Sequence, residues 1–165
     1  HQDRNYPMDS GDFADRGDGA GAGFNLNIPL PPGTGHIGYI ATMERIVLPQ
    51  IRAFKPDVMV IACGYDAAAI DPLGRMLATA ETFQVMTQQV KALAEDICGG
   101  RLMMAHEGGY SEGYVPFCGH HVLAEMSDST ITAPDPFAEV FPLRQPSVAF
   151  DRFVDDQLSQ MLDAL

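Results

Sequence analysis

The chain has 165 residues, about the size of one domain, and its 46% hydrophobic and 19% charged content is ordinary for a folded globular protein. It contains no run of about eighteen apolar residues, which argues against a membrane-spanning helix. The formal net charge of -12 argues against binding to nucleic-acid phosphates and favours cationic small molecules or Lys-rich peptides as partners.

The cysteine content indicates a reduced compartment. Cys63, Cys98 and Cys118 form no C-x-x-C pair, and an odd count does not suit a disulfide framework. The chain starts at His1 without an initiator Met and shows no secretory leader, so we expect a cytoplasmic protein and a segment cut from something longer.

The first half of the chain is predicted to contain a long loop, a short strand and a helix. Residues 1–23 are polar and glycine-rich, which is typical of a functional loop. Phe24–Ile28 alternates like a strand, and Pro29 ends it. From Ile37 to Phe54 apolar residues recur at helical spacing, and Pro49 is expected to kink or restart that helix.

The second half alternates between buried strands and helices. Residues 57–62 and 102–105 are short apolar runs that predict buried parallel strands. Between them, apolar residues from Phe83 to Ile97 follow the helical period, and Gly99 ends the helix. Residues 127–147 are expected to be a surface connection before a last amphipathic helix. This order predicts an α/β fold with a mainly parallel sheet and helices on its faces.

An acid and a tyrosine follow the two predicted strands. In open parallel sheets, ligands bind beyond the carboxyl ends of the strands, where Gly64-Tyr65-Asp66 and Glu107-Gly108-Gly109-Tyr110 stand. Topology therefore predicts that Asp66 and Tyr110 share one rim. A plain turn at Gly-Gly-Tyr, a capping role for Asp66 and a turn-starting role for Asp71 before Pro72 are alternative interpretations of the same residues.

Several ordered stretches together resemble the zinc-dependent histone deacetylase family. They are Phe24–Gly35, Ala53–Asp57, Gly64-Tyr65-Asp66 with Asp71-Pro72-Leu73-Gly74, and Glu107-Gly108-Gly109-Tyr110. The similarity extends through Gly119 and is closest to bacterial histone deacetylase-like amidohydrolases and acetylpolyamine amidohydrolases.

The resemblance implies a three-layer α/β/α, arginase-like fold, of which residues 1–165 would be the C-terminal portion of a single domain. In that division 1–23 is an active-site loop region, 24–126 holds sheet and helices, and 127–165 is the connection and C-terminal helix. The expected activity is hydrolysis of acyl-lysine or acylpolyamine amides by metal-activated water. Asp66 then matches a zinc ligand, and Tyr110 matches the tyrosine that stabilises the oxyanion.

The resemblance also assigns residues around the substrate. Tyr6 stands where the family usually has a Phe lining the acyl-lysine tunnel, and Leu73, Gly108 and Gly109 fall on the tunnel or pocket wall. Phe24 stands where a backbone carbonyl commonly serves a second, structural potassium site. Tyr65 replaces a commoner Phe.

The family's His-His dyad and Asp-x-His ligand pair would have to lie before His1. We therefore expect the 165-residue segment alone to hold zinc weakly and to turn over no substrate. A sheet edge left open in the segment would favour a homo-oligomer. His120-His121 matches the dyad only in residue type, because the pair follows the Pro116-Phe117-Cys118-Gly119 turn and is expected on a helix well past the tyrosine loop.

Two other functions compete with the deacetylase interpretation. Gly109-Tyr110-Ser111-Glu112-Gly113 matches the G-x-S-x-G elbow of serine hydrolases, with Ser111 as nucleophile. The only acid between Ser111 and a later histidine is Glu112, which is too close to orient the base. The other competitor is a non-catalytic acidic domain that binds a basic partner.

Overall fold

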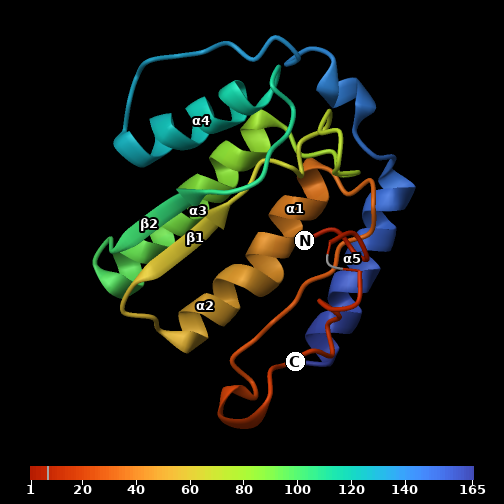
Figure 1. The fold of residues 1–165 in the computed structure, drawn as a ribbon, viewed down its shortest axis with the longest axis vertical. Helices are drawn as coiled ribbons and strands as arrows, with labels where there is room; N and C mark the ends of the chain where they lie inside the picture. The colour runs from red at the N-terminus through yellow and green to blue at the C-terminus, as the bar shows by residue number, and fades with distance from the viewer. Residues whose placement is uncertain (7) are drawn as a thin grey trace.

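The computed structural model describes residues 1–6 and 8–165 (Figure 1). A parallel pair of strands lies beside a layer of helices, and the C-terminal helix crosses the far side of that layer. The helices and strands are α1 (His36–Thr42), α2 (Leu48–Phe54), β1 (Met59–Cys63), α3 (Ala80–Cys98), β2 (Leu102–His106), α4 (Val115–Ser127) and α5 (Val148–Asp163).

The sheet and its crossover match the prediction. β1 and β2 pair in parallel, from Met59 opposite Leu102 to Cys63 opposite His106, and α3 connects them. α3 begins with a capping box in which the Thr79 and Thr82 side chains each accept from the other's backbone amide. It ends at Gly99, whose φ of 61° is left-handed.

The helix predicted over residues 37–54 forms with a widened middle. Between α1 and α2, residues Met43–Val47 make a π-helical stretch in which the Leu48 amide donates to the Met43 carbonyl. Pro49 follows in the first turn of α2. In a regular α-helix its ring would clash with the carbonyl four residues earlier, so the wider turn accommodates the proline without breaking the helix.

The strand predicted over Phe24–Ile28 does not form. The chain there has no regular structure, and only Leu30 pairs, through an isolated parallel bridge with Gln2. Prolines at 29, 31 and 32 lack the amide that a ladder requires. Leu26 and Ile28 instead pack against the cluster that contains Val154 and Leu158 of α5.

The connection between α4 and α5 is more structured than expected. It contains a 3₁₀ turn, Phe141–Arg144, and Phe141 is only 1% exposed. The Gln145 side chain accepts from the His36 amide at 2.8 Å and donates to the Leu77 carbonyl at 2.9 Å. These bonds fasten the connection to the start of α1.

One face of the sheet is covered by helices and the other is open. Met59, Leu102 and Met104 pack against Val90 and neighbouring side chains of α3. On the opposite face the paired residues Val60 and Met103 are 60% and 54% exposed. The described residues thus form two of the three layers expected for an α/β/α fold, the sheet and one layer of helices. No helix among them combines the length and apolarity needed to cross a membrane.

Candidate active site

The loops that leave β1 and β2 lie against each other. The Tyr65 amide donates to the Gly108 carbonyl at 2.8 Å, and the Glu107 amide donates to the Cys63 carbonyl at 3.1 Å. The two loops therefore continue the pairing of the strands and form one rim at their carboxyl ends.

The side chains of Asp66 and Tyr110 both lie beside Gly108. A Cβ atom built on Gly108 would lie 3.0 Å from Asp66 Oδ2 and 3.3 Å from the Tyr110 hydroxyl. One built on Gly64 would lie 3.0 Å from Asp66 Oδ1. Both side chains are exposed, so the carboxylate and the phenol border one open space whose floor is glycine. The shared rim predicted from topology is what the geometry shows.

The Asp71 carboxylate links the two loops by hydrogen bonds. Its side chain is 8% exposed, and Oδ1 accepts from the amides of Leu73 and Gly74 at 2.8 and 2.9 Å. Its Oδ2 accepts from the Tyr110 amide at 2.7 Å. The predicted turn-starting role is therefore real, and the same carboxylate also fixes the backbone of Tyr110.

Tyr65 supports the rim from the core. It is 5% exposed and packs edge-on against Phe83 of α3, with ring centroids 5.2 Å apart. Burial raises the pKa of its phenol far above the ordinary value. Gly109 has a φ of 127°, and a Cβ there would lie 2.9 Å from Tyr65 Cβ, so glycine is required at 109.

A cavity of about 160 Å³ opens beside Asp66. Tyr6, Tyr39 and Gly74 are among the residues that line it together with Asp66. Tyr6 is 92% exposed, and Leu73, on the turn held by Asp71, is 60% exposed. Of the residues expected to line a substrate channel, Tyr6 thus lies beside Asp66, and both Tyr6 and Leu73 reach into solvent.

Residues 1–126 match the family profile of the histone deacetylase domain. The chain belongs to the histone deacetylase family. It is 45% identical over 161 residues to a histone deacetylase-like amidohydrolase of Pseudomonas aeruginosa, which covers 98% of this chain and 42% of that protein. It is 39% identical over 118 residues to a probable deacetylase of Archaeoglobus fulgidus, covering 71% of this chain and 33% of that one.

Solved structures agree with this membership. The crystal structure of the HDA15 HD domain superimposes with a TM-score of 0.75 at 30% identity, covering 99% of this chain and 43% of that one. The histone deacetylase Clr3 gives a TM-score of 0.71 at 28% identity, covering 98% and 27%. The fold is therefore the α/β fold of deacetylase domains, and this chain spans less than half the length of these relatives.

Asp66 is the residue of this deacetylase-family chain that is expected to bind zinc, and that role stays a prediction. Among the described residues no group of three His, Cys, Asp or Glu side chains comes together to hold a metal ion. None of the ion pairs found in the same part of the chain uses Asp66. Its carboxylate is thus free to be one ligand and is insufficient as the whole set.

Phe24 lies away from this rim. Its ring packs edge-on against Phe54 of α2, with centroids 6.1 Å apart, and lines a groove with Val58 and Met59 at the start of β1. Asp66 follows the other end of that strand. The expected potassium role concerns the backbone carbonyl of Phe24, and it stays a prediction.

The serine-hydrolase geometry is not assembled around Ser111. Its carbonyl accepts from the amides of Tyr114 and Val115 at the start of α4. His120 and His121 lie on α4, and their rings bond the carbonyls of Ile131 and Phe117. In the described part of the chain neither histidine is hydrogen bonded to Ser111.

One structural residue of this deacetylase-family chain escaped the sequence analysis. Tyr114 is fully buried, and its hydroxyl accepts from the Ala80 amide and donates to Asp135 Oδ2, both at 2.8 Å. It therefore caps α3 and anchors the connection at the same time. The only available signal was an aromatic residue just before a predicted helix, which is too general to assign.

Proposed function

We propose that the complete protein is a zinc-dependent amidohydrolase that removes acetyl or other acyl groups from lysine side chains or polyamines. The observation that carries this proposal is the convergence of Asp66 and Tyr110 over Gly108. Family membership supports it, because two of the relatives are named as an amidohydrolase and a probable deacetylase.

Asp66 is proposed as one ligand of the zinc ion. Its exposed carboxylate has no competing cation among the described ion pairs. Zinc bound there would supply Lewis-acid activation of the amide carbonyl and of water. Because one carboxylate holds zinc weakly, we propose that the other ligands come from outside these 165 residues and that the segment alone is inactive.

Tyr110 is proposed as the hydrogen-bond donor to the amide oxygen. Negative charge grows on that oxygen as the carbonyl carbon becomes tetrahedral, and a fixed phenol O–H stabilises it. The hydroxyl borders the same space as the Asp66 carboxylate, so both groups can reach one amide. The bond from the Tyr110 amide to Asp71 restricts where the phenol sits.

The surroundings suit an acylated amine. Tyr6 offers apolar surface beside Asp66 that can flank an alkyl chain, and the exposed Leu73 lies on the neighbouring turn held by Asp71. The net charge of -12 attracts a substrate that carries further positive charges, as a polyamine or a Lys-rich peptide does.

The proposal is tested by three substitutions in the complete protein, with zinc content measured alongside turnover of an acetyl-lysine peptide and an acetylpolyamine. Asp66→Asn is expected to lose zinc and activity together. Tyr110→Phe is expected to keep zinc and lose turnover about 100-fold or more, the usual effect of removing one oxyanion donor. Ser111→Ala is expected to change neither.

Other outcomes favour the competitors. Loss of turnover in Ser111→Ala, with activity retained in Tyr110→Phe, would establish a serine hydrolase. Unchanged function in both Asp66→Asn and Tyr110→Phe would establish a non-catalytic acidic domain.

A further inference from the structure

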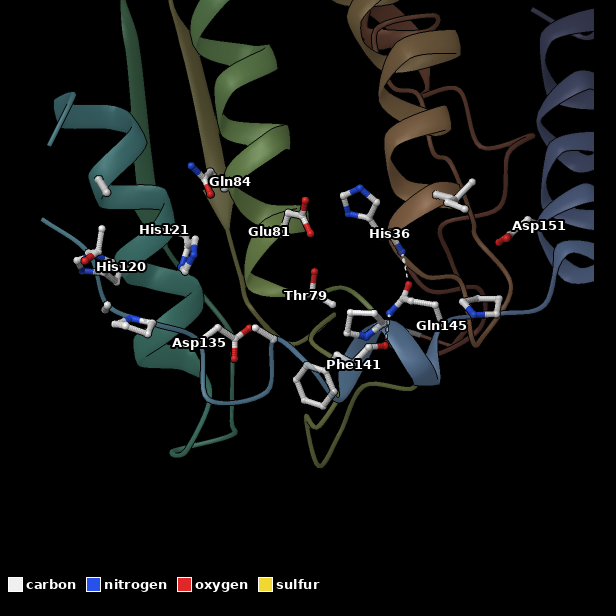
Figure 2. Close-up of a pocket in the computed structure, with 18 residues that line it drawn as sticks. His36, Thr79, Glu81, Gln84, His120, His121, Asp135, Phe141, Gln145 and Asp151 are labelled. Atoms are coloured by element: carbon white, nitrogen blue, oxygen red, sulfur yellow. Dashed lines mark hydrogen bonds between the residues drawn. The ribbon is translucent and has the colours of Figure 1, made fainter. Parts of the chain in front are cut away.

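A second pocket lies apart from the rim that holds Asp66 and Tyr110. Its volume is about 650 Å³, within the usual range for small-molecule sites, and neither of those residues lines it (Figure 2). One wall comes from the starts of α1 and α3 and from α4. The other comes from residues 132–151, which lie beyond the stretch matched by the deacetylase family profile.

The pocket combines apolar walls with a few convergent polar groups. Ile37, Ala138 and Pro142 contribute apolar surface. Glu81 and His36 line the same pocket from α3 and α1 (Figure 2). The two helices are linked by a 3.0 Å hydrogen bond between His36 Nδ1 and Thr82 Oγ1. Such a surface suits a ligand with an apolar body and one polar end.

The pocket offers hydrogen-bond acceptors to the polar end of a ligand. His121 Nδ1 lies 2.8 Å from the Phe117 carbonyl, which can only accept, so the ring donates there and its neutral form keeps a lone pair on Nε2. Glu81 and Asp151 add carboxylates, and neither takes part in the ion pairs found among the described residues.

The charge of the pocket selects a cation. Among the described residues that line it, none is Lys or Arg, whereas Glu81, Asp135 and Asp151 are acidic. Asp135 is already engaged by the Tyr114 hydroxyl and the Phe137 amide, so Glu81 and Asp151 remain. Burial raises the pKa of the Asp151 carboxyl, as expected for an acid that is partly desolvated without a compensating cation.

A bare metal ion does not fit this arrangement. No group of three potential metal ligands comes together anywhere in the described residues, and the pocket is far larger than an ion. An anion would face carboxylates with no Lys or Arg side chain among the described lining residues to offset them.

We propose that this pocket binds a primary ammonium group carried on a short apolar chain or ring, with Glu81 as its main counter-ion. The apolar body would lie against the wall formed by Ala138 and Pro142, opposite the polar groups of α1 and α3. This site is independent of the proposed hydrolytic centre.

The test measures binding of n-hexylammonium and of hexanoate to the complete protein by titration calorimetry. Saturable binding of n-hexylammonium is expected, with none for hexanoate. Glu81→Gln should weaken ammonium binding about tenfold, which corresponds to losing one charge-assisted hydrogen bond. The matched control Glu95→Gln makes the same change at an exposed position of α3 outside the pocket and should leave the affinity unchanged.

Two further variants locate the site. Ala138 lines the pocket and is exposed, so Ala138→Phe should fill the space and abolish binding without lowering the melting temperature. Tyr110→Phe should leave ammonium binding intact even if it abolishes turnover, which separates this site from the hydrolytic one. The proposal is overturned if n-hexylammonium does not bind, if Glu81→Gln and Glu95→Gln weaken binding equally, or if Tyr110→Phe removes binding while Ala138→Phe does not.

Discussion

The buried carboxylate of Asp71 accepts a 2.7 Å hydrogen bond from the backbone amide of Tyr110, 39 residues further along the chain. Its other oxygen holds the amides of Leu73 and Gly74. A Cβ on Gly74 would lie 1.9 Å from the Asp66 carbonyl, so this turn also presses against the backbone of Asp66. One carboxylate therefore sets the relative positions of the two residues that border the candidate site.

Replacing Asp71 with Asn is expected to lower kcat more than it raises KM. An amide side chain has one acceptor oxygen, so its NH₂ group would face either the Tyr110 amide or those of Leu73 and Gly74. Tyr110 would then be displaced, and a shift of about 1 Å in a catalytic group costs about 100-fold in rate. Steady-state kinetics of the complete protein, with zinc content measured in parallel, would show the effect.

The control for Asp71→Asn is Asp156→Asn, the same change at an exposed position of α5, which should leave kcat unaltered. If Asp71→Asn lowers zinc content and turnover in proportion, the carboxylate acts on the metal side of the site and not on Tyr110.

Gly108→Ala is expected to reduce turnover with little loss of stability. The added methyl would lie 3.0 Å from Asp66 Oδ2 and 3.3 Å from the Tyr110 hydroxyl, closer than most Cβ contacts. Both groups lie at the ends of exposed side chains and can move aside, so the fold should tolerate the change while the site widens. A tenfold or larger fall in kcat/KM is expected, of order 1.4 kcal/mol or more in transition-state stabilisation.

Gly113→Ala is the matched control for Gly108→Ala, because it lies in the same loop and a Cβ there meets nothing within 4 Å. Equal losses of turnover in the two variants would mean that loop flexibility, and not the space over Gly108, limits the reaction.

The parts of the fold that the sequence predicted are those specified by local signals. α3 has an apolar period of 3.6 residues and a glycine directly after its last residue, so its signals lie in or next to the helix itself. β1 and β2 are short apolar runs on either side of it, so a parallel pair was the simple solution. The shared rim of Asp66 and Tyr110 then followed from topology alone.

The missed features depend on partners distant in the chain. The segment 24–28 alternates like a strand, but a strand forms only where a neighbouring edge accepts it, and this segment packs on α5 instead. The bond between Tyr114 and Asp135 joins residues 21 apart, with no pattern linking them. The turn sequence Asp71-Pro72-Leu73-Gly74 predicts the hydrogen bonds from Asp71 to the amides of Leu73 and Gly74, but no local pattern predicts its bond to Tyr110.

Tyr114→Phe is expected to lower the free energy of unfolding by about 2 kcal/mol. The hydroxyl is fully buried and satisfies both the Ala80 amide and one oxygen of Asp135, so its removal leaves the buried Ala80 amide and one oxygen of the half-buried Asp135 without that partner. Denaturant unfolding of the complete protein would measure the change. Tyr6→Phe removes the same atom from a side chain that is 92% exposed and should have almost no effect. Similar stabilities for the two variants would mean that water replaces the Tyr114 hydroxyl.

Cys118 is expected to make the fold less stable as the solution becomes alkaline. Burial, as the largest cause, raises the pKa of its thiol from 9.0 to about 12. Between pH 9 and 12 the folded state therefore holds a proton that the unfolded state has released, and the free energy of unfolding falls as pH rises. Cys118→Ala should reduce the slope of stability against pH in this window, although it also leaves a small cavity that lowers stability at every pH. Because Tyr65 and Tyr114 also have raised pKa values, some slope should persist in the variant.

The burial of Cys118 also predicts that iodoacetamide at pH 8 alkylates the half-buried Cys63 before Cys118, since the thiolate is the reacting form. Mass spectrometry of the labelled peptides would show the order, and early labelling of Cys118 would mean that α4 opens locally.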